Sequence, residues 1–180
     1  YRKSDPLAST EFTYSRFLVP FLNNFEGIAI FCDSDFLWQC SVDEIMEFYD
    51  DKKAVMCVKH DYNPKGNTKM DGRLQSIYPR KNWSSVVLWN CKHPKHKILT
   101  PDFIANQTGK YLHRFSWLEN GDIGELPKEW NWLATEYPNN EQANIIHYTL
   151  GTPCFKDYRK TEMADIWLKK HTRINDGMED

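Results

Sequence analysis

Two aspartates stand two residues apart, directly after the apolar run 27–32. They are Asp33 and Asp35. In an extended segment, residues i and i+2 point to the same side, so both carboxylates can face one crevice. Two carboxylates about 4 Å apart repel by roughly 4 kcal/mol at an effective dielectric near 20. The pair therefore favours a shared proton or a hard divalent cation, and such an ion can also bind a diphosphate.

A divalent ion on a diphosphate suits sugar transfer, in which the leaving group is a nucleoside diphosphate whose developing charge the ion stabilises. Three other interpretations stay open. The aspartates can merely cap the turn after a strand. Asp33 can be the nucleophile of a phosphohydrolase, with Asp35 as its acid–base partner. The chain can also be a non-catalytic carbohydrate-binding module, since its seven tryptophans can stack on sugars.

Continuous apolar runs bounded by polar or glycine residues indicate buried strands. The sequence predicts such strands at 27–32, 54–58, 83–89 and 144–148. Helices are expected at 11–19, at 41–48, from Thr100 onward and after Lys160. Ser41 and Glu44 form a capping box for the second of these helices, and Pro20 is expected to stop the first. Residues 113–138 are expected to be aromatic and loop-like.

Strands that alternate with helices predict an α/β domain, with a mostly parallel, Rossmann-like central sheet flanked by helices. A chain of 180 residues is long enough for one such domain. Ligands collect at the carboxyl ends of the strands in an open α/β sheet, where the two aspartates stand. The polar segment 59–81 is too long for a routine connection and is expected to be a binding loop.

Composition excludes some classes of partner. The net charge of −2, with mixed signs along the chain, argues against a nucleic-acid binder or a polybasic membrane anchor. No apolar stretch reaches the roughly 18 to 20 residues that a transmembrane segment needs. Five cysteines without a framework spacing favour free thiols and a cytoplasmic location. The first residue, Tyr1, leaves a fragment or a removed signal open, and the oligomeric state is not predicted.

The segment Thr13-Tyr14-Ser15-Arg16-Phe17-Leu18-Val19-Pro20, followed by the strand and the Asp-x-Asp pair, resembles glycosyltransferase family 8, the glycogenin and galactosyltransferase-like enzymes. The resemblance covers roughly residues 10 to 155. It implies a GT-A fold and a retaining transfer from a nucleotide sugar, a UDP-sugar, to a carbohydrate acceptor, as in polysaccharide biosynthesis. The family's earlier strand–helix–strand unit, which binds the base, is not visible here.

The resemblance also implies a metal centre. In the family, the two aspartates, here Asp33 and Asp35, ligate manganese, with magnesium as the other candidate. Arg16 is expected near the nucleotide and the metal motif. A late histidine supplies the third ligand, and here it is His147. The segment that begins there is similar to the family's His-x-x-Gly-x-x-Lys-Pro-Trp, although Gly151 comes one residue later than in the family pattern.

Other site residues follow from the same comparison. The family lysine before proline is missing, so Lys156 is expected to reach the diphosphate instead. The remaining residues expected to bind the donor are Ser34, Ser84, Ser85 and Gly151. Lys81 joins them for another reason, because a lysine in the basic segment before the third predicted strand would suit a phosphate contact. Asp122 is the expected catalytic residue on the acceptor side, because the family's Asp-Gln segment resembles the sequence around it.

Overall fold

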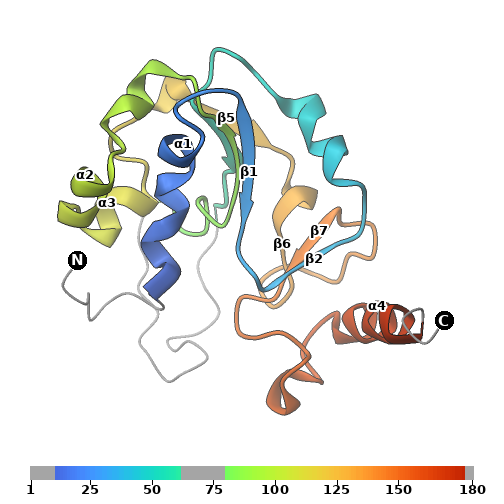
Figure 1. Cartoon of the computed structure of the whole chain (residues 1–180). Helices are drawn as coiled ribbons and strands as arrows, with labels where there is room; N and C mark the ends of the chain where they lie inside the picture. Colours follow the sequence, from blue (N-terminus) through green and yellow to red (C-terminus); the bar gives the residue numbers. More distant parts are fainter. Residues whose placement is uncertain (1–10, 62–79, 177–180) are drawn as a thin grey trace. The chain divides into compact units, whose positions relative to one another are not determined.

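The computed structural model of the chain describes residues 11–61 and 80–176 (Figure 1). These residues divide into two compact units. The first contains residues 11–33, 43–61 and 80–127, and the second contains residues 34–42 and 128–176. The expected binding loop at 59–81 lies largely outside the described residues. Among the described residues, no helix combines the length and hydrophobicity required to cross a membrane.

The first unit is built on a four-stranded sheet with the order β1-β4-β3-β5. Its strands are β1 (Ile28–Cys32), β3 (Val55–Val58), β4 (Val86–Asn90) and β5 (Ile123–Leu126). Strand β4 is antiparallel to both of its neighbours, whereas β3 and β5 are parallel. The fold is therefore mixed α/β, and the expectation of a mostly parallel sheet is wrong here. Apolar runs predict buried strands, but they do not encode strand direction.

Burial separates the central strands of this sheet from the edge. Every residue of β3 and β4 is buried, as the continuous apolar runs predict. Strand β1 is only half-buried, and Ile28 is 38% exposed, because β1 forms one edge of the sheet. Strand β4 begins three residues later than predicted, since residues 80–85 form turns in which Arg80 and Asn82 adopt positive φ angles of 62° and 61°.

Helices lie beside this sheet in Figure 1, and several begin as the sequence predicts. The 3-10 helix η1 (Glu11–Leu18) runs into α1 (Val19–Leu22), so Pro20 lies in the first turn of α1 rather than ending a helix. Helices α2 (Pro101–Asn106) and α3 (Gly109–His113) are capped by threonine hydroxyls. Thr100 accepts the Phe103 N–H at 3.2 Å, and Thr108 accepts the Tyr111 N–H at 3.1 Å. The 3-10 helix η2 spans Val42–Phe48.

The expectation of a loop over residues 113–138 is wrong. This stretch contains short 3-10 helices and strands: η4 (Asn120–Asp122), β5, η5 (Lys128–Asn131) and β6 (Trp132–Leu133). Strand β5 carries Gly124 and Glu125 between two buried residues, so it has no continuous apolar run. Strand β6 has two residues, too few to produce a periodic pattern.

The second unit contains a three-stranded sheet with the order β2-β7-β6. Strand β7 (Ile145–His147) lies at its centre, antiparallel to β2 (Phe36–Trp38) and parallel to β6. Buried Tyr148 donates from its hydroxyl to the Met163 carbonyl at 2.9 Å. Helix α4 (Ala164–Asp176) confirms the helix predicted after Lys160, and Ile166 and Trp167 pack against the same core.

Candidate metal centre

Asp33 is held at the end of β1 by backbone and side-chain bonds. Its N–H donates to the Ser85 carbonyl at 3.0 Å, which extends the β1–β4 ladder by one residue. Both carboxylate oxygens contact the Arg16 guanidinium, with Nη2 to Oδ1 at 2.7 Å and Nη1 to Oδ2 at 3.0 Å. Arg16 Nη1 also donates to the Ser84 carbonyl at 2.8 Å. The carboxylate therefore has a fixed orientation.

Arg16 is itself oriented by the first unit. Its Nε donates to the Thr13 carbonyl at 3.2 Å, one turn earlier in η1. The guanidinium carbon lies 5.0 Å from the centre of the Phe31 ring on β1, a cation–π contact. The side chain is only 11% exposed. The guanidinium therefore lies directly beside Asp33, the first aspartate of the motif, and contact of Arg16 with a nucleotide stays a prediction.

Asp35 and His147 are brought together by the sheet of the second unit. Asp35 directly precedes β2, and its carbonyl accepts the Tyr148 N–H at 3.0 Å. Its neighbour Phe36 pairs with His147 in the β2–β7 ladder. This register places Asp35 Oδ2 at 3.5 Å from His147 Nε2.

The His147 ring has a partner on each of its other sides. Asn131 Oδ1 lies 3.0 Å from Nδ1, and both residues are buried. The Phe36 ring stacks on the imidazole with centroids 4.1 Å apart and planes 27° apart. A neutral ring with its hydrogen on Nδ1 would donate that hydrogen to Asn131 and would leave the Nε2 lone pair directed toward Asp35.

Ligand atoms of Asp33, Asp35 and His147 all lie within 4.8 Å of one another. These are the three residues that the sequence predicts as metal ligands. Asp33 and Asp35 are separated by one residue, so the covalent chain itself keeps their carboxylates near each other. Two carboxylate oxygens and one imidazole nitrogen form a donor set that suits Mn²⁺ or Mg²⁺, and Mn²⁺ accepts the nitrogen more readily.

Ser84 and Ser85 are buried at the turn before β4, and their hydroxyls bond within the first unit. Ser84 Oγ lies 2.7 Å from His113 Nδ1, and Ser85 Oγ donates to the Asn82 carbonyl at 2.7 Å. Their carbonyls accept from Arg16 and from the Asp33 N–H. The two serines therefore support the acidic motif through the backbone, and contact with the donor sugar stays a prediction.

The other residues predicted to bind the donor lie in turns or at an element start. Ser34 is an exposed turn residue between the aspartates, and Lys81 is half-buried in the turn before β4. Gly151 is buried with a φ of 150°, and its N–H donates to the Tyr148 carbonyl at 3.0 Å. Lys156 is exposed and begins the 3-10 helix η6 (Lys156–Tyr158). Their roles toward a donor stay predictions.

The topology argues against the catalytic role predicted for Asp122. Strands β1, β3 and β5 run in the same direction. Asp33 follows the carboxyl end of β1, whereas Asp122 precedes the amino end of β5. The two residues therefore lie at opposite ends of the parallel strands. The Asp122 carboxylate also accepts from Lys95 Nζ at 2.6 Å and from the Glu119 N–H at 2.7 Å. Burial raises its pKa, but these bonds outweigh burial and lower the pKa overall.

Two neighbours of His147 have no signal in the sequence. Phe36 follows the acidic motif as one of several aromatic residues, and Asn131 is a polar residue in a stretch expected to be a loop. Only the pairing of β7 with β2 on one side and with β6 on the other brings them to the imidazole. The predicted strand at 144–148 does not identify either partner.

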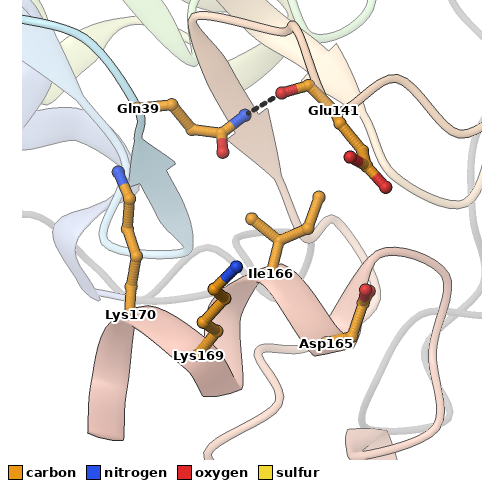
Figure 2. A pocket seen from close by; sticks show the side chains of 6 residues that line it. All are labelled: Gln39, Glu141, Asp165, Ile166, Lys169 and Lys170. Atoms are coloured by element: carbon orange, nitrogen blue, oxygen red, sulfur yellow. Dashed lines mark hydrogen bonds between the residues drawn. The ribbon is translucent and has the colours of Figure 1, made fainter. Parts of the chain in front are cut away.

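A surface hollow of about 260 Å³ lies in the second unit (Figure 2). Its lining residues come from the end of β2, a loop and helix α4: Gln39, Glu141, Asp165, Ile166, Lys169 and Lys170. Gln39 donates to the Glu141 carbonyl at 3.2 Å, as Figure 2 shows. The lining carries two lysines and two acidic residues, so the hollow has no net charge that would select a phosphate.

Comparison with known proteins gives one structural and one sequence relative. No family model matches the chain. The apo structure of the bifunctional glycosyltransferase WbbM has a similar fold, with a TM-score of 0.53 and 15% identity. The match covers 89% of this chain and only 35% of the WbbM chain. A likeness at this identity concerns the fold, which supports the predicted glycosyltransferase-like architecture. Membership of family 8 stays a prediction.

The sequence relative is much closer. Protein CDI from Arabidopsis thaliana is 48% identical over an alignment of 180 residues. The alignment covers 97% of this chain and 70% of the relative. Identity at this level over nearly the whole chain shows common descent. This chain belongs to the family of Protein CDI.

Proposed function

We propose that this chain is a metal-dependent glycosyltransferase that moves a sugar from a nucleoside-diphosphate sugar, a UDP-sugar, to a carbohydrate acceptor with retention. The observation that carries the proposal is the group of ligand atoms of Asp33, Asp35 and His147, all within 4.8 Å of one another. The likeness in fold to the glycosyltransferase WbbM supports the same class of reaction. The name of Protein CDI adds no substrate.

Each residue of the group has a distinct task in this proposal. A bound Mn²⁺ or Mg²⁺ would stabilise the charge that develops on the diphosphate leaving group. Asp33 presents a carboxylate whose orientation Arg16 fixes through two contacts of 2.7 and 3.0 Å. Asp35 and His147 converge from paired strands of the second unit. The set therefore combines two negative charges with one neutral nitrogen ligand.

The bonds of Asp33 favour transfer over phosphohydrolase chemistry. A nucleophilic aspartate must direct a reactive carboxylate oxygen at phosphorus. Here both Asp33 oxygens accept from Arg16, which withdraws electron density from them and fixes their direction. A ligand tolerates this arrangement better than a nucleophile does. A carbohydrate-binding module would have no need of the part-buried Arg16–Asp33 pair.

The test is release of nucleoside diphosphate from a panel of nucleotide sugars, with and without Mn²⁺. We expect turnover of at least one donor, complete loss in chelator, and recovery when Mn²⁺ is returned. Asp35→Asn should lower turnover at least about hundredfold, because it removes a charged ligand while keeping the side-chain shape. Asp43→Asn is the matched control, since Asp43 is exposed on η2. Full turnover of Asp35→Asn in chelator would sink the proposal.

The wider setting is part of the same proposal. We place the enzyme in the cytoplasm, in polysaccharide biosynthesis, with one GT-A-like domain. Lys81 and Lys156 are proposed to contact the diphosphate, and Ser34, Ser84, Ser85 and Gly151 to line the donor site. Acceptor-side catalysis is assigned to no residue, because Asp122 and Asp33 lie at opposite ends of the strands of the first sheet.

A further inference from the structure

The imidazole of His147 lies in the middle strand of the three-stranded sheet and is only 4% exposed. A histidine ring in such a site can exist as either of two neutral tautomers, and only the nitrogen without a hydrogen can bind a metal ion. If the hydrogen stood on Nε2, the atom 3.5 Å from Asp35 Oδ2 would be a donor and not a ligand. Something in the sheet must therefore select the tautomer.

Asn131 is placed to make that selection. It is completely buried at the end of η5, directly before β6. The parallel register pairs Leu133 of β6 with His147 of β7, so Asn131 stands two residues before the partner of the histidine. Its Oδ1 lies 3.0 Å from Nδ1, and an amide oxygen can only accept. This contact favours the tautomer with its hydrogen on Nδ1.

Phe36 restricts the same ring from another side. It pairs with His147 in the β2–β7 ladder, and the two rings stack at 4.1 Å. Stacking limits tilting of the imidazole plane, but it does not distinguish one nitrogen from the other. Two acceptor oxygens do distinguish the nitrogens: Asn131 Oδ1, at 3.0 Å, favours a hydrogen on Nδ1, and Asp35 Oδ2, at the longer distance of 3.5 Å, favours one on Nε2.

We infer that Asn131 is a positioning residue, which holds the hydrogen of His147 on Nδ1 and so presents Nε2 as a metal ligand. This inference rests on the proposed function for the metal, but the tautomer itself can be observed without any ion. A histidine that binds a metal through one ring nitrogen usually donates a hydrogen bond from the other nitrogen. Loss of that bond typically lowers metal affinity about 10- to 100-fold.

Three variants test the role of Asn131. Asn131→Leu keeps the branch at Cγ and removes the acceptor, whereas Asn131→Asp keeps an acceptor oxygen. Tyr148→Phe is the matched control for stability, because it removes one buried hydrogen bond, to the Met163 carbonyl, in the same unit. Nitrogen-15 spectra of the metal-free protein, under conditions in which the ring is neutral, report the tautomer of His147. Titration with Mn²⁺ alone, followed by electron paramagnetic resonance of the free ion, reports affinity.

We expect the Nδ1–H tautomer in the original protein, in Asn131→Asp and in Tyr148→Phe, and a shift to Nε2–H in Asn131→Leu. Affinity for Mn²⁺ should fall about 10- to 100-fold in Asn131→Leu only. An unchanged tautomer and unchanged affinity in folded Asn131→Leu would overturn the inference. If the original protein binds no Mn²⁺, the proposed function fails, and the tautomer spectra still decide the role of Asn131.

Discussion

Arg16 binds Asp33 through both carboxylate oxygens, at 2.7 and 3.0 Å, while one of its nitrogens also donates to the Ser84 carbonyl at 2.8 Å. One guanidinium thus links η1, the end of β1 and the turn before β4. The planar fork of arginine makes these contacts simultaneously, which a lysine ammonium on a flexible stem cannot do. Arg16 therefore fixes the position of the first carboxylate of the acidic motif.

Arg16→Lys tests this link, because it keeps the charge and removes the fork. We expect Mn²⁺ affinity to fall about tenfold, since Asp33 loses its fixed orientation. The free energy of unfolding should fall by about 1 to 2 kcal/mol from the lost hydrogen bonds. Isothermal titration with Mn²⁺ and urea unfolding measure the two effects. Arg159→Lys is the control, because Arg159 is exposed; equal behaviour of the two variants would contradict a special role for Arg16.

Metal binding should also raise the melting temperature. An ion that binds only the folded state adds about 2.7 kcal/mol when its concentration is 100 times its Kd. For a chain of this size, that corresponds to an increase of roughly 5 to 10 °C. Differential scanning calorimetry in Mn²⁺ and in chelator measures it. His147→Ala should abolish the difference between the two conditions, and an unchanged difference would remove this histidine from the metal centre.

The strands with continuous apolar runs are predictable because burial on both faces leaves a local pattern. Strand β3 is the clearest case, since each of its four residues is buried. Strand β5 is not predictable, because its parallel pairing with β3 places Gly124 opposite Met56. A Cβ on this glycine would lie 2.7 Å from Met56 Cγ. The Met56 side chain thus fills the space that an apolar side chain at position 124 would need, and the apolar run that would have identified β5 is interrupted.

The group of three candidate metal ligands was predictable for a different reason. Asp33 and Asp35 are separated by one residue, and their placement after a strand carries chemical meaning in itself. His147 required the likeness to a family motif, because it lies more than a hundred residues away. Asn131 depends on strand register alone, and no local pattern encodes register. Residues that hold a ligand in place are therefore harder to predict than the ligand.

Asp122 provides a test of the sheet topology against the sequence-based prediction. Its carboxylate accepts from Lys95 and from the Glu119 N–H. It lies at the amino end of β5, whereas Asp33 lies at the carboxyl end of β1. Asp122→Asn should therefore lower the free energy of unfolding by about 1 kcal/mol while leaving kcat for sugar transfer within about threefold. Urea unfolding and steady-state kinetics measure both. A large loss of kcat without loss of stability would restore the catalytic role.

His96 is a second histidine with defined hydrogen-bond partners. It is distant in sequence from the three candidate metal ligands. It is completely buried, its Nε2 lies 2.9 Å from the Ala54 carbonyl, and its Nδ1 accepts from Trp117 Nε1 at 3.4 Å. Burial lowers the His96 pKa to about 4; the Ala54 bond and Asp122 oppose this effect, and His93 reinforces it. The folded protein therefore keeps this ring neutral at pH values where the unfolded chain protonates it.

This difference makes stability depend on pH in a defined direction. Between about pH 6.5 and pH 4 the unfolded state binds the extra proton, so the free energy of unfolding falls as pH falls. The His96 contribution to this loss should be about 2 to 3 kcal/mol on going from about pH 7.5 to about pH 4.5. His96→Gln retains a donor for the Ala54 carbonyl but has no titrating group. Urea unfolding of both proteins at the two pH values isolates the effect, because all other titrating groups are shared. The loss of stability between the two pH values should be about 2 to 3 kcal/mol smaller in the variant than in the original protein. Equal losses in the two proteins would mean that His96 is protonated in the folded state.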